Sequence, residues 1–170
     1  DVGRMSMSNR PDRSDMDYIN LQLRTAPRLT VDGLPLIKPP YGQVVALDLN
    51  EGEKLWDAVH GETPDSIRNH PALAGLDIPR TGQDGRVGVL VTKTLVIAGD
   101  GGSYTNADGE QEALLRAYDK LSGAQLGSLA MPAQQTGSPM TYAIDGVQYL
   151  AVAIAGSDVP GRLRVYSYEP

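Results

Sequence analysis

The residues of this chain best suited to chemistry lie in one polar stretch at 61–85, GETPDSIRNHPALAGLDIPRTGQDG. The planar guanidinium of Arg80 matches the geometry of a carboxylate, so it is a candidate partner for an acidic ligand. Long ordered loops often carry function, and we predict a ligand-binding site here. A loop tied down by its own polar groups explains the same residues equally well. The candidates are Asn69, His70, Arg80, Thr81 and Gly82.

Other polar residues are weaker candidates. His60 and His70 lack a third ligand at a recognised spacing, and a zinc site needs three or four, so we interpret both as loop or surface histidines. The stretch GDGG at 99–102 lacks the lysine of a phosphate-binding loop and the alternating acids of an EF-hand, which predicts a flexible connection between strands. QQTG at 134–137 is a weak candidate for lining the same site as Arg80.

Composition limits the class of protein. The 170 residues are 41% apolar and 21% charged, with a net charge of −6 and no basic patch, which argues against nucleic acid as a partner. The absence of cysteine excludes disulfides, thiolate metal sites and cysteine nucleophiles. No apolar run approaches the ~20 residues that span a bilayer. The chain starts with Asp and has no signal peptide, so we expect it to begin inside a larger protein.

One stretch occurs twice. QVVALDLNEGEKLWDAV at 43–59 aligns with LRAYDKLSGAQLGSL at 115–129 at a constant offset. In each copy an acid, Asp48 or Asp119, opens a turn before a glycine, where its side chain accepts bonds from backbone N–H groups. Because the acid is repeated, we interpret it as structural rather than catalytic. A repeated hairpin predicts a repeat architecture.

Many glycines and prolines between short apolar runs predict an all-β chain. We expect residues 1–17 to be extended or loose and 24–40 to form a connecting loop. Thr63-Pro64-Asp65 predicts a short helix at 64–69 with Thr63 as its cap, and Pro71 predicts a second turn ending at Gly75. Four strands within 86–129 complete one antiparallel sheet. The expected strands are 18–23, 43–49, 54–59, 86–92, 95–98, 114–118, 125–129, 140–144, 148–154 and 162–168.

Three stretches resemble one family. The pattern A-x-D-x-x-x-G-x-x-x-W at 46–56 resembles the tryptophan-docking repeat of propellers in pyrroloquinoline quinone (PQQ) dehydrogenases. LIKPPYG at 36–42 resembles the stretch before this repeat in membrane-type quinoprotein glucose dehydrogenases and their soluble relatives. GSPMTY at 137–142 and the residues up to Val152 resemble the closing blade of the same family. The resemblance covers about 33–168 and points to the carboxyl-terminal part of the propeller domain.

The resemblance implies an all-β partial β-propeller, with about two to three four-stranded antiparallel blades of an eight-bladed ring. Residues 1–42 would supply a partial blade and connecting loop. Residues 43–170 would supply the end of one blade, one complete blade and three strands of the last. Trp56 would dock between blades rather than stack on the quinone. The loop at 61–85 would face the cofactor, where Arg80 would pair with a PQQ carboxylate.

The resemblance also implies an activity for the parent protein: oxidation of a glucose-like sugar or an alcohol, with PQQ as hydride acceptor and calcium as Lewis acid. The family's catalytic Asp, calcium ligands and quinone-gripping residues lie upstream of the matched region. We therefore assign no catalytic or metal residue here and expect the segment alone to be inactive.

Expected partners are the remaining blades, in the same protein or a separate chain, and the substrate. Open strand edges predict an oligomer or a complex. The resemblance implies a periplasmic location, with membrane association through parts outside this chain. The alternative is a non-catalytic propeller scaffold, as in outer-membrane assembly lipoproteins, whose loops bind proteins.

Overall fold

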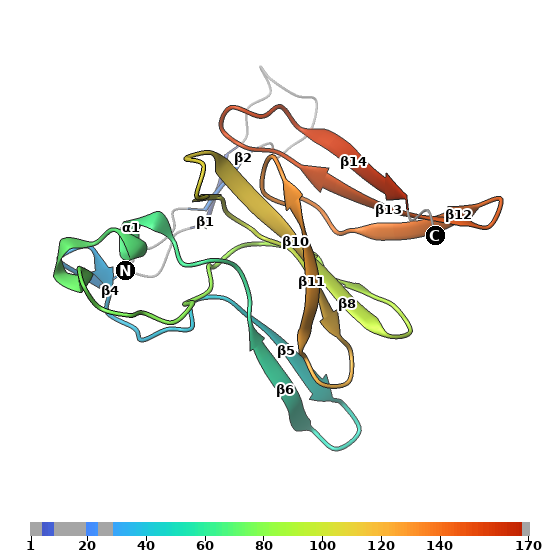
Figure 1. Ribbon diagram of the computed structural model, residues 1–170, viewed down its shortest axis with the longest axis horizontal. Helices are drawn as coiled ribbons and strands as arrows, with labels where there is room; N and C mark the ends of the chain where they lie inside the picture. Colours follow the sequence, from blue (N-terminus) through green and yellow to red (C-terminus); the bar gives the residue numbers. More distant parts are fainter. Residues whose placement is uncertain (1–4, 9–19, 24–28, 168–170) are drawn as a thin grey trace. The chain divides into compact units, whose positions relative to one another are not determined.

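The computed structural model describes residues 5–8, 20–23 and 29–167. The chain divides into two compact units, Asp1–Ile37 and Lys38–Pro170, which we describe separately. Almost all regular structure in the described residues is antiparallel strand (Figure 1). The all-β prediction is therefore confirmed. No helix in the described residues is long and apolar enough to cross a membrane.

The first unit holds two small pairs of strands. β1 (Met5–Ser8) pairs with β2 (Asn20–Leu23), and β3 (Thr30–Val31) pairs with β4 (Leu34–Pro35). β1 lies in the stretch expected to be extended or loose, and it is extended. The β3–β4 hairpin corrects one expectation, because it lies in the stretch expected to be a connecting loop. β2 pairs with β1, and residues 18–19 of its expected range lie outside the described residues.

The second unit contains one complete blade, whose strands run in the order β11-β10-β8-β7. A short strand, β9, adds to the start of β10. This sheet confirms the four antiparallel strands expected within 86–129. Its members are β7 (Leu90–Val91), β8 (Leu95–Gly99), β9 (Tyr104–Thr105), β10 (Gln111–Asp119) and β11 (Gln125–Met131).

The inner strand β7 is much shorter than the 86–92 predicted from its apolar run. The carbonyl of Gly88 accepts a hydrogen bond from Gln135 Nε2 at 2.7 Å instead of joining the sheet. Gly88 also packs directly on Ser138 of the following loop, where a Cβ would collide. Contacts with residues far along the chain therefore keep Gly88 out of the strand that the apolar pattern predicted.

Parts of two further blades flank the complete one. β5 (Gln43–Asp48) and β6 (Glu53–Val59) form a hairpin of their own. β12 (Met140–Ile144), β13 (Val147–Ile154) and β14 (Arg162–Ser167) form the three-stranded sheet that the sequence predicts. Residue 168, the expected last residue of β14, lies outside the described residues.

The repeated hairpin is confirmed in its details. Ala46 pairs with Trp56, and the equivalent Ala117 pairs with Gly127, with a register shift after the alanine in both copies. Asp48 Oδ1 accepts hydrogen bonds from the N–H groups of Asn50 and Glu51. Asp119 Oδ1 does the same for the two equivalent residues. Both acids therefore shape turns, as predicted.

Both faces of the complete blade are covered, because successive side chains of β10 point to opposite sides. Ala113 and Leu115 belong to a buried cluster with Val152 and Ile154 of β13. Tyr118 belongs to a second cluster with Trp56 of β6 and Val96 of β8. This two-sided burial explains the nearly continuous apolar runs.

Trp56 docks against the neighbouring blade, as the resemblance implied. Its side chain is 8% exposed, and its Nε1 donates a hydrogen bond to the carbonyl of Lys120 at 2.9 Å. Gly123, with φ of +74°, lets the turn approach the indole, since an added Cβ would lie 2.5 Å from Cε3. The turn between β10 and β11 is thus fitted to the tryptophan of the preceding hairpin.

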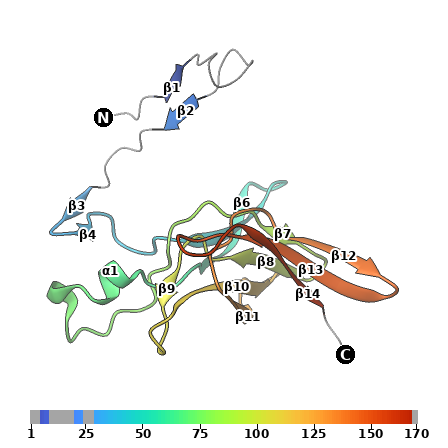
Figure 2. The same cartoon turned by 90° about the horizontal axis from the view of Figure 1, so that it is seen from above.

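Within the described residues of the second unit, the strand directions place the long loops between strands at one end of the sheets (Figure 2). We call this the loop end, and it carries residues 60–89, 100–110, 132–139 and 155–161. The opposite turn end carries the tight connections. The first long loop contains helix α1 (Asp65–Arg68) and 3-10 helix η1 (Pro71–Leu73), close to the predicted positions. Thr63 does not cap α1, because its Oγ1 accepts a bond from the Thr81 N–H instead.

Candidate functional site

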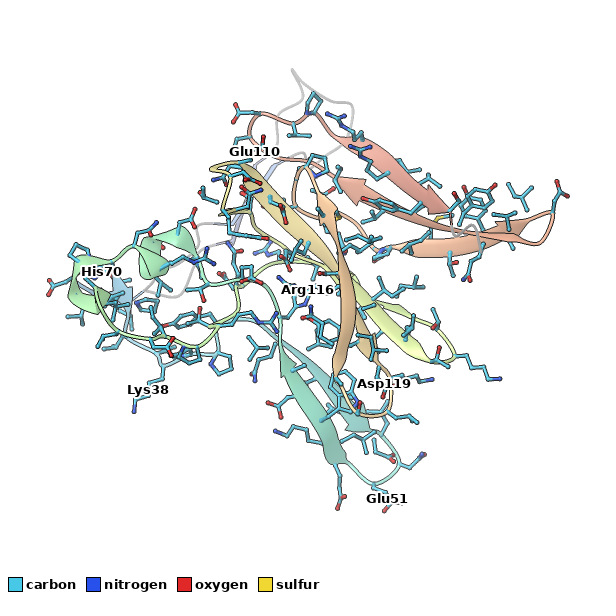
Figure 3. All side chains as sticks on the ribbon, viewed as in Figure 1. Lys38, Glu51, His70, Glu110, Arg116 and Asp119 are labelled. Carbon is cyan, nitrogen blue, oxygen red and sulfur yellow. The ribbon has the colours of Figure 1, made fainter. Side chains whose placement is uncertain are left out.

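A buried arginine lies at the centre of the loop end. Arg116 comes from the middle of β10 (Figure 3). Its side chain is 1% exposed. Nε and Nη2 donate to the two carboxylate oxygens of Asp100 at 2.8 and 3.1 Å. Asp100, which has no exposed surface, also accepts a bond from the Leu114 N–H at 3.1 Å. This bidentate pair is the strongest polar contact geometry that the two groups can form.

Glu62, at the start of the long loop, joins this pair to the surface. Its Oε1 accepts a hydrogen bond from Arg116 Nη2 at 2.9 Å. Arg80 Nη1 lies 3.9 Å from the same oxygen, and Arg68 Nη2 lies 3.7 Å from Oε2. Three guanidinium groups, two from the long loop and one from β10, therefore surround one carboxylate.

Electrostatics keeps the buried arginine charged. Burial alone would lower the pKa of Arg116, but hydrogen bonds and charges from Asp100, and then from Glu62, outweigh burial and raise the pKa. The arginine thus remains a permanent cation in the core. Because a lone buried charge would be very unfavourable, its position depends on both acids.

A second buried polar pair lies beside this network. His60 Nδ1 is 2.8 Å from the Tyr118 hydroxyl, and Nε2 is 3.1 Å from the Gly99 carbonyl. The carbonyl can only accept, so Nε2 carries a proton and Nδ1 accepts from Tyr118 in the neutral ring. Burial lowers the pKa of His60, and burial raises the pKa of Tyr118 to about 12. His60 therefore lies in the long loop, as interpreted, but it is 5% exposed and so is not a surface residue.

Three of the five predicted site residues are held within the fold. Arg80 donates from Nη1 to Gln125 Oε1 and from Nη2 to the Val59 carbonyl, both at 3.0 Å. Thr81 is 3% exposed, and its hydroxyl donates to the carbonyl of Gly82. Gly82, with φ of +69°, packs against the backbone of Gly42. These contacts anchor the long loop to β6, to β11 and to the residue before β5, and a role in cofactor binding stays a prediction.

The other two predicted residues lie elsewhere on the same loop. His70 accepts a hydrogen bond from the Ala72 N–H and so caps η1. Figure 3 shows His70 at the outer edge of the loop, away from Arg116. Asn69 ends α1 and lines a pocket of about 630 Å³ between α1 and β9. The five residues therefore fall in separate places, and the cofactor role of Asn69 and His70 also stays a prediction.

A second hollow, of about 490 Å³, lies where the loops of two blades meet, and Gln134 and Thr136 line it. The neighbouring Gln135 is not in the hollow: it is 2% exposed and accepts a bond from the Gly99 N–H at 2.6 Å. In the described residues no group of three or more His, Cys, Asp or Glu side chains is placed to hold a metal ion.

Sequence reasoning missed the residues that hold the loop end together. Asp100 is buried and paired, whereas GDGG was predicted to be a flexible connection. One signal was available: Arg116 interrupts the apolar strand LLRAY, and a charge inside such a strand requires a buried partner. Nothing in the sequence indicates that the partners are Asp100 and Glu62, which come from two other loops.

The stacked blades and the docking tryptophan define a segment of a β-propeller. Residues 4–150 match the family described as "Glucose/ethanol/alcohol dehydrogenase, beta-propeller domain", which bears the name PQQ. This match covers most of the chain. The chain therefore belongs to the PQQ β-propeller family of quinoprotein dehydrogenases.

Relatives of this chain are named for different substrates. It is 31% identical over 124 residues, 73% of its length, to quinoprotein glucose dehydrogenase A of Acinetobacter calcoaceticus. It is 30% identical over 141 residues, 79% of its length, to the glycerol dehydrogenase large subunit of Gluconobacter thailandicus. It is 30% identical over 135 residues, 76% of its length, to a probable quinate dehydrogenase (quinone) of Xanthomonas campestris pv. juglandis.

These alignments cover only 14%, 18% and 15% of the three relatives, so the chain corresponds to a small part of each. No solved structure matches the chain. All three relatives are named dehydrogenases.

Proposed function

We propose that the full-length protein containing this chain oxidises a sugar or another alcohol. The match to the PQQ propeller family over residues 4–150 carries this proposal. When bound, PQQ would supply the hydride acceptor and calcium a Lewis acid. We assign no calcium ligand and no catalytic base to this chain.

This chain's own part is to form and stiffen a wall of the site. The Arg116–Asp100 pair and Glu62 tie the long loop to the complete blade. Such buried bonding holds a loop in one geometry, and binding sites need that precision. Arg80 uses one N–H of each terminal nitrogen within the protein, so these two bonds leave three of its five N–H groups with which it could bind a carboxylate.

We propose Asn69, His70, Arg80, Thr81 and Gly82 as the residues by which the long loop approaches the cofactor. Asn69 is the most available, because its side-chain amide makes no hydrogen bond to another described residue. The remaining blades, in the same protein or a separate chain, would close the ring. We propose a periplasmic location for the assembly.

The test uses the full-length protein, purified without cofactor and reloaded with PQQ and calcium. Reduction of an artificial electron-accepting dye is followed with glucose, glycerol, ethanol and quinate in turn, with unloaded protein as control. We expect PQQ-dependent dye reduction with at least one sugar or alcohol. Failure to bind PQQ, or no reduction with any of the four, would refute the proposal.

A further inference from the structure

The 630 Å³ pocket between α1 and β9, which we call the α1–β9 pocket, brings together side chains of contrasting chemistry. Its lining includes carboxylates, a guanidinium, an amide and an aromatic ring. Its size is typical of small-molecule sites. The groups that matter for a ligand are Glu62, Asp65, Arg68, Asn69 and Tyr104.

Two of these side chains keep unused hydrogen-bonding capacity. Glu62 Oε1 is held by Arg116, but Oε2 has only Arg68 Nη2 at 3.7 Å, which is beyond hydrogen-bond distance. The Asn69 amide, which both donates and accepts, has no hydrogen bond to the rest of the described chain. Arg68 donates one long bond, 3.4 Å, to the Thr63 carbonyl, and its Cζ lies 5.7 Å from the centre of the Tyr104 ring.

The walls of the pocket are fixed before any ligand binds. Asp65 Oδ2 accepts bonds from Thr105 Oγ1 at 2.6 Å and from its N–H at 3.0 Å, which joins α1 to β9. The Tyr104 hydroxyl donates to Glu112 at 2.8 Å, and burial together with this bond raises its pKa to about 12. Arg116 Nη2 donates a hydrogen bond to Glu62 Oε1 at 2.9 Å and so fixes the Glu62 carboxylate. Preorganisation of this kind reduces the entropy lost on binding.

The charges favour a neutral ligand with several hydroxyl groups. Each carboxylate of the lining is partnered: Glu62 by arginines and Asp65 by Thr105. An anion would gain Arg68 but meet both acids, whereas a hydroxyl both donates and accepts. It can therefore fill the gap between Glu62 Oε2 and Arg68. We propose that the α1–β9 pocket binds a neutral monosaccharide or sugar alcohol, with one hydroxyl bridging Glu62 and Arg68 and a second on Asn69.

A local reporter tests this in the full-length, cofactor-loaded protein. Ala107 is exposed and lines the pocket, and this chain has no cysteine of its own. Ala107→Cys carrying a trifluoromethyl tag is followed by ¹⁹F NMR, with the same labelled protein lacking Ala107→Cys as baseline. We expect a saturable shift on titration with glucose or glycerol. Quinate, an anionic polyol, should produce a weaker response or none.

Two variants and a control decide the assignment. Arg68→Met should raise the apparent Kd by about tenfold or more, and Asn69→Ala by about threefold, as expected for a charged and a neutral hydrogen bond. Lys93→Met removes a cation from the exposed turn between β7 and β8, at the turn end, and should leave the titration unchanged. If Arg68→Met fails to fold, Asn69→Ala remains a valid test because it breaks no hydrogen bond among described residues.

Three outcomes would overturn the proposal: no saturable shift with either neutral compound, stronger binding of quinate than of both, or unchanged affinity in the pocket variants. All three outcomes are measured as ligand binding by the label at position 107, and none depends on catalytic turnover. The pocket can therefore fail while the dye assay succeeds, and the reverse.

Discussion

Removal of the buried charge of Arg116 tests whether the stability of the loop end depends on one ion pair. Arg116→Met keeps most of the apolar stem but leaves Asp100, which has no exposed surface, with one remaining hydrogen bond from the Leu114 N–H. Removing one partner of a buried pair typically costs about 3–5 kcal/mol, because the other charge stays buried. We expect a loss of this size in the free energy of unfolding.

The neighbouring acid supplies the comparison. Glu62 is 23% exposed, so water screens its pair with Arg116, and Glu62→Gln should cost only about 1 kcal/mol. The double variant Arg116→Met with Asp100→Asn removes both buried charges. It should recover about 1–3 kcal/mol relative to the sum of the single losses.

Urea denaturation at fixed protein concentration measures these differences. Trp56 is the single tryptophan of the chain, and it packs on the turn that follows β10, so its fluorescence reports on this region. A loss below about 1 kcal/mol in the free energy of unfolding of Arg116→Met would refute the reasoning, because a buried unpaired carboxylate should destabilise the fold by more than that. Strict additivity in the double variant would refute it as well.

Four further predictions follow from the same contacts. Trp56→Ala should lower the free energy of unfolding by about 3–5 kcal/mol in urea denaturation followed by circular dichroism. The PQQ affinity of the folded full-length protein should stay unchanged. A large loss of PQQ affinity at constant stability would instead make Trp56 a platform for the cofactor. Gly123→Ala should cost at least 1 kcal/mol more than Gly52→Ala, since both have positive φ but only the first meets the indole; equal losses would argue against the docking contact. Because burial holds the pKa of His60 below 6.5, the unfolded chain takes up a proton before the folded chain does as the pH falls. The free energy of unfolding should therefore decline from about pH 6.5 downward. In denaturation series at several pH values, His60→Gln should abolish this decline. The isolated 170-residue chain should self-associate through the open edge at Arg162–Ser167; a monodisperse monomer in light scattering, with slow amide exchange along β14, would contradict this.

The fold was largely predictable because its information is local. A turn that needs an acid for its N–H groups and a glycine for positive φ leaves the same residues in both hairpins, Asp48 with Gly52 and Asp119 with Gly123. Apolar runs marked the strands of the complete blade because both faces are covered. The short β7 was not predictable, since Gln135, far along the chain, takes the Gly88 carbonyl away from the sheet.

The candidate site was only partly predictable, because its bonds join distant segments. The long loop was identified correctly as polar and ordered, but nothing local distinguishes Arg80, held by Gln125 and Val59, from an arginine aimed at a ligand. His60 likewise has the sequence context of a loop residue and becomes buried only because Tyr118 and Gly99 reach it from the next blade. Burial of polar groups is a tertiary property, and spacing in one segment does not encode it.

The two ends of the complete blade are therefore stabilised by different means. At the turn end, hydrogen bonds within each turn shape the hairpins by a motif that repeats, and the docked Trp56 holds two blades together. At the loop end, ion pairs among Arg116, Asp100 and Glu62 hold two loops without using the strand ladder. The side chain of Asn69, on the same long loop as Glu62, makes no hydrogen bond to another described residue. We infer that side chains at the loop end can differ between members of the family while the blade beneath keeps its geometry. This separation fits a family whose members are named for glucose, glycerol and quinate.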